Sequence, residues 1–269
     1  MKVAIRGPAR HPWSRWGSEL YLPIMREYLR LSRTLTYSLL FAAPLFVLYE
    51  VGAAYLNGVE QTTLRNGADV LLRTLLAMGG VQGTAAFTGV LLLIAIVLII
   101  IERRRQRVPL RAGVFAGMML ESLAYALLFG VVVGTATQWV LRGTGLGLFM
   151  AAGPVASLSM REGVVLSLGA GIYEELVFRV LLVGGLFGVF RSSGVARRSA
   201  GVFAAILAAL VFSGFHYIGA YGDPFTVSSF LFRFLAGLAF SVLFLVRGFG
   251  VTAWTHALYD VVLFLARGF

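Results

Sequence analysis

The sequence predicts an all-α fold, a polytopic transmembrane bundle of about seven helices, and its composition and long apolar runs are the observations that predict it. Hydrophobic residues make up 59% of the 269 residues and charged residues only 13%, and the mean hydropathy is +0.86. A soluble domain of this size could not cover so much apolar surface. Because backbone polar groups find no water inside a bilayer, runs of about 20 apolar residues are expected to cross it as helices.

Seven runs have the length and composition of membrane spans. They cover residues 35–57, 81–101, 112–136, 162–190, 201–222, 226–247 and 251–267. Residues 68–78 have apolar positions at helical spacing, but they include Asp69 and Arg73 and are too short to span. We therefore expect a helix at the membrane interface there, with an eighth span as the alternative.

The arginines predict the orientation of the bundle. If the spans alternate strictly, the basic N-terminal segment, the ERRRQR run at 102–107, the RSSGVARR segment at 191–198 and Arg247 fall on one side. The positive-inside rule makes that side the cytoplasm. We expect residues 1–34 to form a basic cytoplasmic arm and residues 35–269 the transmembrane bundle, with the N-terminus in the cytoplasm.

Composition also excludes several classes of partner and chemistry. The formal net charge of +11 does not indicate a nucleic-acid partner, because the arginines lie in short segments between apolar runs and form no continuous basic face. The sequence has no cysteine, which excludes a disulfide framework, a thiolate metal site and a cysteine nucleophile. The expected surroundings are the lipid bilayer.

Several ionisable residues fall within the predicted spans. A charge at the bilayer centre costs at least about 2.5–3.5 kcal/mol on insertion scales, so such residues usually have a partner or a function. They are Glu50, Glu121, Glu174, Glu175, Arg179, His216, Arg233, His256 and Asp260. The sequence assigns no role to Glu50, Glu121 and Arg233.

The densest polar group is the YEELVFR sequence at residues 173–179. On a helix Glu175 and Arg179 lie at i, i+4 in the favourable acid-first order, whereas Glu174 is turned by about 100°. Glu174 has no cation of its own in the sequence and is the candidate for proton transfer. The alternative is a structural ion network that holds helices together, and for Glu175 and Arg179 both interpretations stay open.

Two further motifs carry histidines in later spans. Phe212 and His216 share a helix face in FSGFH, and His256 and Asp260 lie at i, i+4 in HALYD, where the carboxylate can orient the imidazole. At 1.5 Å per residue, Glu174 and His216 both lie about 24 Å from the cytoplasmic turn. His256 lies about 15 Å nearer the cytoplasm, so a re-entrant turn, a tilt or a wrong span boundary must supply the difference.

The ordered set EExxxR, FxxxH and HxxxN or HxxxD on successive apolar helices resembles the CAAX protease and bacteriocin-processing family, which includes the Ras-converting CAAX prenyl endopeptidases. The resemblance covers roughly residues 160–265, the expected peptidase core. It implies an intramembrane endopeptidase, a hydrolase acting on a peptide or protein substrate that is prenylated or otherwise membrane-associated. We expect the protein in a prokaryotic plasma membrane.

The resemblance also implies roles, carried over by motif position. Glu174 would be the general base that activates water, with help from His216, and His256 together with Asp260 would stabilise the oxyanion. Asp260 stands where one version of the family has Asn. Because an ionised Asp cannot donate a hydrogen bond, Asp260 is either protonated or acts by orienting His256.

No cofactor is expected, and zinc is the alternative. Catalytic zinc takes three protein ligands plus water, which here would be His216, His256 and Glu174, but the HExxH spacing that would fix such a site is absent. Two other functions also stay open. A non-catalytic scaffold, chaperone or immunity protein of the same fold is the first, and a transporter or proton relay that uses the remaining intramembrane charges is the second.

Overall fold

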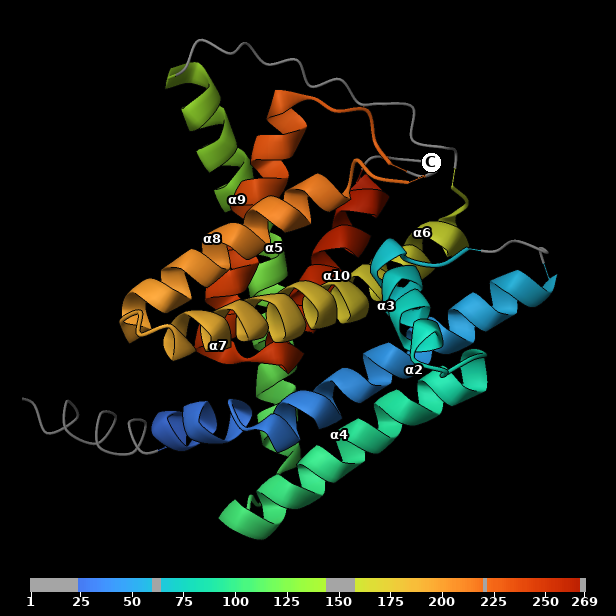
Figure 1. The fold of residues 1–269 in the computed structure, drawn as a ribbon, viewed down its shortest axis with the longest axis vertical. Coiled ribbons are helices and arrows are strands. Elements are labelled where there is room, and N and C mark those ends of the chain that lie inside the picture. The colour runs from blue at the N-terminus through green and yellow to red at the C-terminus, as the bar shows by residue number, and fades with distance from the viewer. Residues whose placement is uncertain (1–23, 60–63, 144–157, 220–221, 267–269) are drawn as a thin grey trace, which may run out of the picture.

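The structure is a computed structural model that describes residues 24–59, 64–143, 158–219 and 222–266, and within these ranges it is helical without strands (Figure 1). The helices are α2 (Leu35–Val59), α3 (Gly67–Met78), α4 (Thr84–Gln106), α5 (Ala112–Gly143), α6 (Met160–Gly169), the π-helices η1 (Ala170–Glu174) and η2 (Leu176–Val183), α7 (Gly184–Ser192), α8 (Arg197–Phe215), α9 (Val227–Arg247) and α10 (Phe249–Ala266). The predicted all-α fold is confirmed. Residues 24–32 of the expected arm are helical, and the rest of that arm lies outside the described residues.

Six of the described helices are long and apolar enough to cross a membrane: α2, α4, α5, α8, α9 and α10. Each matches one predicted span. The remaining predicted span, residues 162–190, is a continuous helical rod that runs through α6, η1, η2 and α7. Residues 68–78 fall within α3, whose 12 residues give a length of about 18 Å at 1.5 Å per residue, too short to span.

The α6–α7 rod is π-helical over most of its middle. The two π-helices contain nearly all of the YEELVFR sequence, with Glu175 between them in α-helical form. π-helical turns are rare and are found frequently at functional sites, so the backbone of this segment, as well as its charges, indicates a functional site. The rod starts at a capping box, in which the Ser159 hydroxyl accepts from the Glu162 N–H and the Glu162 carboxylate accepts from the Ser159 N–H.

One predicted boundary is wrong. The span expected at 201–222 ends at Phe215, and His216 is the C-cap of α8 rather than a residue in the middle of a span. The apolar tract continues past His216, which is why hydropathy extends the span. The backbone turns there nevertheless, with Gly219 in the left-handed region at φ +92° and Pro224 close behind.

The helices are also far from parallel. Figure 1 shows α8 and the α6–α7 rod running across α5 and α9 at a steep angle. Counting residues from the turns that are expected in the cytoplasm therefore does not measure depth on one common axis. A tilt is one of the three explanations left open for the depth of His256, and Figure 1 shows helices that are tilted relative to one another.

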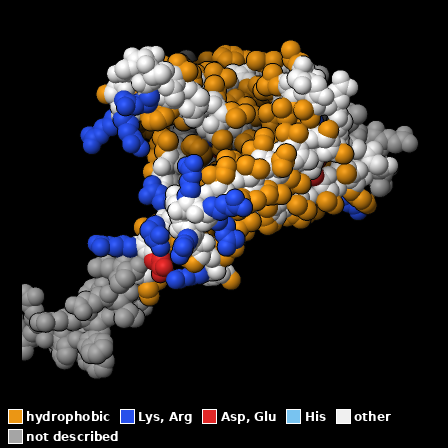
Figure 2. Space-filling view, turned by 60° about the horizontal axis from the view of Figure 1, so that its bottom comes forward, with side chains coloured by type: hydrophobic (Ala, Val, Ile, Leu, Met, Phe, Trp, Pro, Cys, Tyr) orange, Lys and Arg blue, Asp and Glu red, His pale blue; other side chains and the backbone are white. Residues whose placement is uncertain are grey.

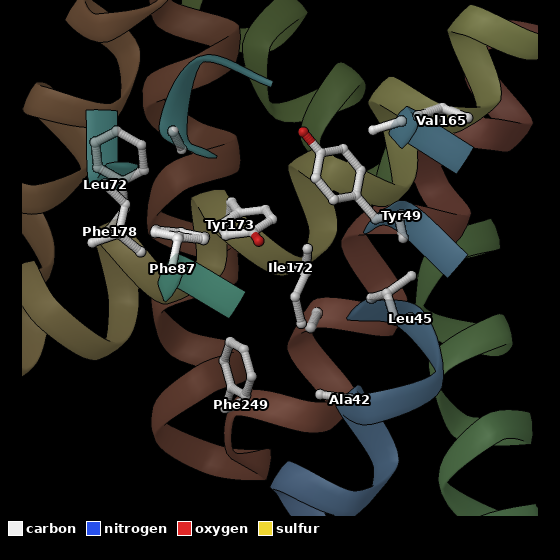
Figure 3. Packing of buried hydrophobic residues seen from close by; sticks show 14 of the residues in the cluster. Ala42, Leu45, Tyr49, Leu72, Phe87, Val165, Ile172, Tyr173, Phe178 and Phe249 are labelled. Carbon is white, nitrogen blue, oxygen red and sulfur yellow. The ribbon is translucent and has the colours of Figure 1, made fainter. Parts of the chain in front are cut away.

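Aromatic packing and two glycines bring the elements of the site together. Tyr173 of η1 packs against Tyr49 of α2 and Phe87 of α4, with ring centroids 5.2 and 6.1 Å apart (Figure 3). A Cβ at Gly169 would lie 2.4 Å from the Tyr49 ring, and one at Gly171 would lie 2.5 Å from a backbone carbonyl of α10. Only glycine allows α2 and α10 to approach the rod this closely, immediately before Glu174.

The exterior of the molecule is mainly apolar, whereas its interior contains charged residues. Hydrophobic side chains cover most of the face shown in Figure 2, and the Lys and Arg side chains on that face gather mainly at one end of the molecule. Arg103, Arg104 and Arg105 lie in the last turn of α4, and Arg191 lies in the last turn of α7. An apolar surface with basic residues at helix ends is what a bilayer requires, and the chain is an integral membrane protein.

Candidate active site

Glu174 and two histidines, each from a different helix, lie close together. Glu174 ends η1 and is only 7% exposed, His216 caps α8, and His256 lies in the second turn of α10. The Glu174 Oε2 atom is 3.9 Å from Nε2 of His216 and 4.0 Å from Nε2 of His256. The fold thus brings together residues that the sequence separates by 42 and 82 positions (216 − 174 and 256 − 174).

The environment of His216 fixes its tautomer. Its Nδ1 atom lies 2.8 Å from the carbonyl oxygen of Phe212. Because a carbonyl only accepts, Nδ1 donates, and a neutral His216 therefore keeps its lone pair on Nε2, the atom that faces Glu174. With 24% of its side chain exposed, His216 is more accessible than His256, whose side chain is 5% exposed.

Glu175 joins His256 to Arg179. Its Oε1 atom accepts from Nδ1 of His256 at 2.7 Å, and its Oε2 atom lies 3.2 Å from Nε of Arg179. The i, i+4 ion pair expected from the sequence is therefore present. The Arg179 guanidinium also lies over the Phe212 ring, with Cζ 4.5 Å from its centroid. The contact between Glu175 and His256 is one that the sequence did not indicate.

Asp260 lies on the other side of the His256 ring. Its Oδ2 atom is 3.4 Å from Nε2 of His256, and its side chain is 28% exposed. The Phe240 ring stacks on His256 with centroids 4.4 Å apart. Because Glu175 already binds Nδ1, the orienting contact at that nitrogen comes from the first motif, and Asp260 faces the same nitrogen as Glu174.

Asn66 is a further site residue, one that sequence reasoning missed. Its Nδ2 atom donates to Oε1 of Glu174 at 2.9 Å. Asn66 is also the N-cap of α3, where its Oδ1 atom accepts from the backbone N–H of Ala68 at 2.8 Å. An Asn directly before Gly67 and a helical pattern is a recognisable cap signal, but nothing in its spacing connects it to Glu174.

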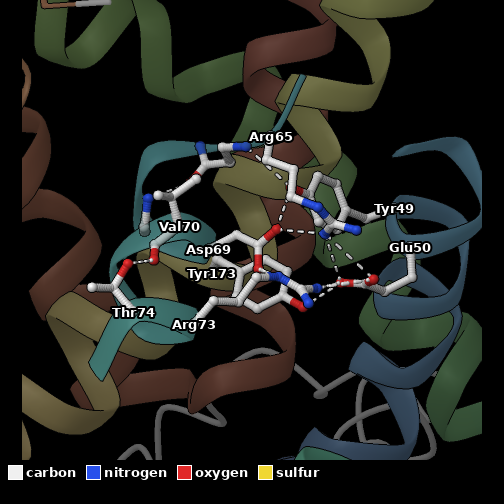
Figure 4. Close-up of polar contacts among 10 residues, drawn as sticks. Tyr49, Glu50, Arg65, Asp69, Val70, Arg73, Thr74 and Tyr173 are labelled. Carbon is white, nitrogen blue, oxygen red and sulfur yellow. Dashed lines mark hydrogen bonds and ion pairs between the residues drawn. The ribbon is translucent and has the colours of Figure 1, made fainter. Parts of the chain in front are cut away.

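A dense polar network continues from α3 to α2 and η1 (Figure 4). Asp69 pairs with Arg65 at 2.7 Å and with Arg73 at 2.6 Å, and Glu50 accepts from Arg73 at 2.8 Å and from the Tyr173 hydroxyl at 2.6 Å. Burial opposes the charge of Arg65, but its hydrogen bond to Asp69 and the charges of Asp69 and Glu50 raise the pKa of Arg65 above its ordinary value. Glu50 thus holds α3 against the rod.

The other two intramembrane charges also have counter-charges. Glu121 of α5 accepts from Arg247 of α9 at 2.6 Å, and Arg233 of α9 pairs with Asp223 in the loop before it. These are ion pairs between elements that pack together or follow one another, as expected of charges that stabilise a membrane bundle. Glu50, Glu121 and Arg233, to which the sequence assigned no role, thus each have a counter-charge.

A family model described as "Type II CAAX prenyl endopeptidase Rce1-like" matches residues 156–262. The match supports membership of residues 156–262 in the CAAX protease family. The CAAX protease core thus runs through α6 to α10 and contains all six site residues expected from the motifs, so the recognition made from three short motifs is confirmed.

Asn66 and the whole of α3 lie outside the matched residues. The searches of curated proteins and of solved structures gave no match.

Proposed function

We propose that the protein is an intramembrane endopeptidase in which Glu174 activates water. The observation that carries the proposal is the approach of Glu174 Oε2 to within 3.9 and 4.0 Å of two histidine nitrogens in a buried position of a CAAX protease core. Ionisable residues inside a membrane protein are candidates for a functional site by default, and those that meet in a buried position are stronger candidates.

In the proposed mechanism, Glu174 accepts a proton from water as the oxygen attacks the carbonyl carbon of the scissile bond. The proton then passes to the leaving nitrogen as the peptide bond breaks. His216 assists from Nε2, which carries its lone pair in the tautomer that the Phe212 carbonyl selects. Water, base and histidine would act as one unit at the exposed side of the site.

His256 is proposed to stabilise the oxyanion. Glu175 holds the ring at Nδ1, so an imidazolium would donate from Nε2 toward the oxygen of the tetrahedral intermediate. Asp260, 3.4 Å from the same Nε2, would either donate when protonated or help to keep the ring in place. In both cases its part is secondary to that of Glu175.

The proposed substrate is a peptide or protein at the membrane, prenylated or otherwise held by an apolar group. An apolar exterior favours a substrate that reaches the site from the bilayer. The test uses purified protein in lipid nanodiscs with two sets of reporter peptides, identical except for a farnesyl group on one cysteine. We expect endoproteolysis of the prenylated set, with the cut position read by mass spectrometry. Failure of folded wild-type protein to cut either set would reject the proposal.

Removal of bound metal with a chelator tests whether the activity depends on a metal ion. We expect protein purified with chelator, and holding well under one zinc per chain by elemental analysis, to retain the turnover of untreated protein, because Glu174 and His216 activate the water. Among the residues that the structure describes, no group of three or more His, Asp or Glu side chains is arranged to hold a metal ion. If zinc were bound, the facing Nε2 atoms of the two histidines and Oε2 of Glu174 would be its ligands, and it would supply Lewis-acid activation of water.

The opposite result is equally clear. Loss of turnover on stripping, with recovery on addition of one equivalent of zinc, would show that the protein is a zinc enzyme at the same site. Addition of magnesium instead of zinc is the control for non-specific effects of the chelator on the bilayer.

A further inference from the structure

We propose that Asn66, which lies outside the CAAX protease core, is a positioning residue for Glu174. The inference rests on the proposed function, because it assigns Asn66 a part in preparing the general base. It starts from one contact, the hydrogen bond from Asn66 Nδ2 to Glu174 Oε1 at 2.9 Å. Both residues are buried, at 8% and 7% exposure.

The direction of this hydrogen bond is fixed by a second one. An Asn amide can usually be flipped, but here Oδ1 accepts from the backbone N–H of Ala68, which can only donate. Nδ2 is therefore the atom that faces Glu174, and it donates to the carboxylate. A residue that served only as a helix cap would need Oδ1 alone.

The backbone of Asn66 is held as firmly as its side chain. Its N–H donates to the Tyr49 hydroxyl at 3.1 Å, and that hydroxyl donates to Asp69 at 2.8 Å. Asp69 is fully buried and is paired with Arg65 and Arg73. The start of α3 is thus fixed on α2, and the Asn66 amide is presented to Glu174 with little freedom to move.

The two carboxylate oxygens of Glu174 have different partners. Oε1 is occupied by Asn66, so Oε2 is the oxygen that faces His216 and His256. A neutral donor aimed at a carboxylate favours its ionised form, which is the form a general base needs. Asn66 therefore holds Glu174 in the rotamer that presents Oε2 to the two histidines.

The test separates this role from that of a helix cap. Asn66→Ser keeps a good capping oxygen but removes the donor to Glu174. Thr74→Gly, at an exposed position inside α3, weakens the same helix without touching the site. We expect Asn66→Ser to lower kcat by about 10- to 100-fold with KM within about twofold of wild type, as for a misplaced catalytic group, and Thr74→Gly to leave kcat nearly unchanged.

A second measurement does not depend on turnover. The infrared carboxylate band of Glu174 is identified by its loss in Glu174→Gln, and its frequency is compared between variants. We expect the frequency to shift in Asn66→Ser relative to wild-type protein and to Thr74→Gly, because the hydrogen bond to Oε1 is gone.

The outcomes distinguish the two proposals. If wild-type protein cuts no peptide but the infrared band still differs between wild-type protein and Asn66→Ser, the peptidase is rejected and the contact between Asn66 and Glu174 is kept. An unshifted band, or a kcat of Asn66→Ser within twofold of wild type, would overturn the role of Asn66. Equal losses of kcat and Tm in Asn66→Ser and Thr74→Gly would reduce Asn66 to a helix cap.

Discussion

Glu174→Gln is expected to remove peptide cleavage while leaving the fold intact. The amide keeps the size of the side chain, and its oxygen can still accept from Asn66, so the buried contact at 2.9 Å survives. The amide cannot take a proton from water, and the loss of a general base costs about 10²- to 10⁴-fold in rate. The measurement is kcat/KM on the prenylated reporter peptide, together with Tm in the same nanodiscs.

Two controls accompany this variant. Glu27→Gln changes a glutamate of the N-terminal helix, which pairs with Arg111, and should leave cleavage unchanged. His216→Ala should lose activity to a similar degree, and the double variant with Glu174→Gln should be no worse than either single change, because groups that act as a unit are not additive. Activity of Glu174→Gln within about tenfold of wild type would remove Glu174 from the role of base.

The spans and the three motifs could be predicted because each depends on residues close together in the sequence. The length of an apolar run of about 20 residues matches the bilayer thickness, and the spacing of Glu175 and Arg179 matches about one helical turn. The proximity of Glu174 and His216 was also expected, since both positions were counted from the same turn between two adjacent spans. Their 3.9 Å approach agrees with that count.

The contacts that could not be predicted join residues far apart in the sequence. Asn66 reaches Glu174 across 108 positions, and Glu175 reaches His256 across 81. Their existence depends on how steeply the helices cross and on Gly169 and Gly171, whose missing side chains let α2 and α10 approach the rod. Hydropathy contains neither the crossing angles nor the partner of a given glycine. The end of α8 at Phe215 was placed too late for another reason, because the apolar tract continues past His216.

Arg179→Ala is expected to fail by a different route from Glu174→Gln, through loss of stability. Glu175 is fully buried, and without the guanidinium it would keep only His256 as a partner. Breaking one half of a buried ion pair costs about 3–5 kcal/mol. The change also empties the space beside Phe212 and Phe240, over whose rings the guanidinium lies. We expect poor expression, a lower Tm and loss of activity together.

A double variant shows whether charge or volume is responsible. Arg179→Met combined with Glu175→Gln removes both charges, fills most of the space and keeps an oxygen that can accept from Nδ1 of His256. Replacing a buried pair by neutral groups of similar volume is often tolerated, so Tm should return toward the wild-type value. Cleavage should recover in part, because His256 would again be held at Nδ1. A stable and fully active Arg179→Ala protein would show that the contact of Arg179 with Glu175 contributes nothing to the fold, whereas a double variant as unstable as Arg179→Ala would assign the loss to packing rather than to the unpaired carboxylate.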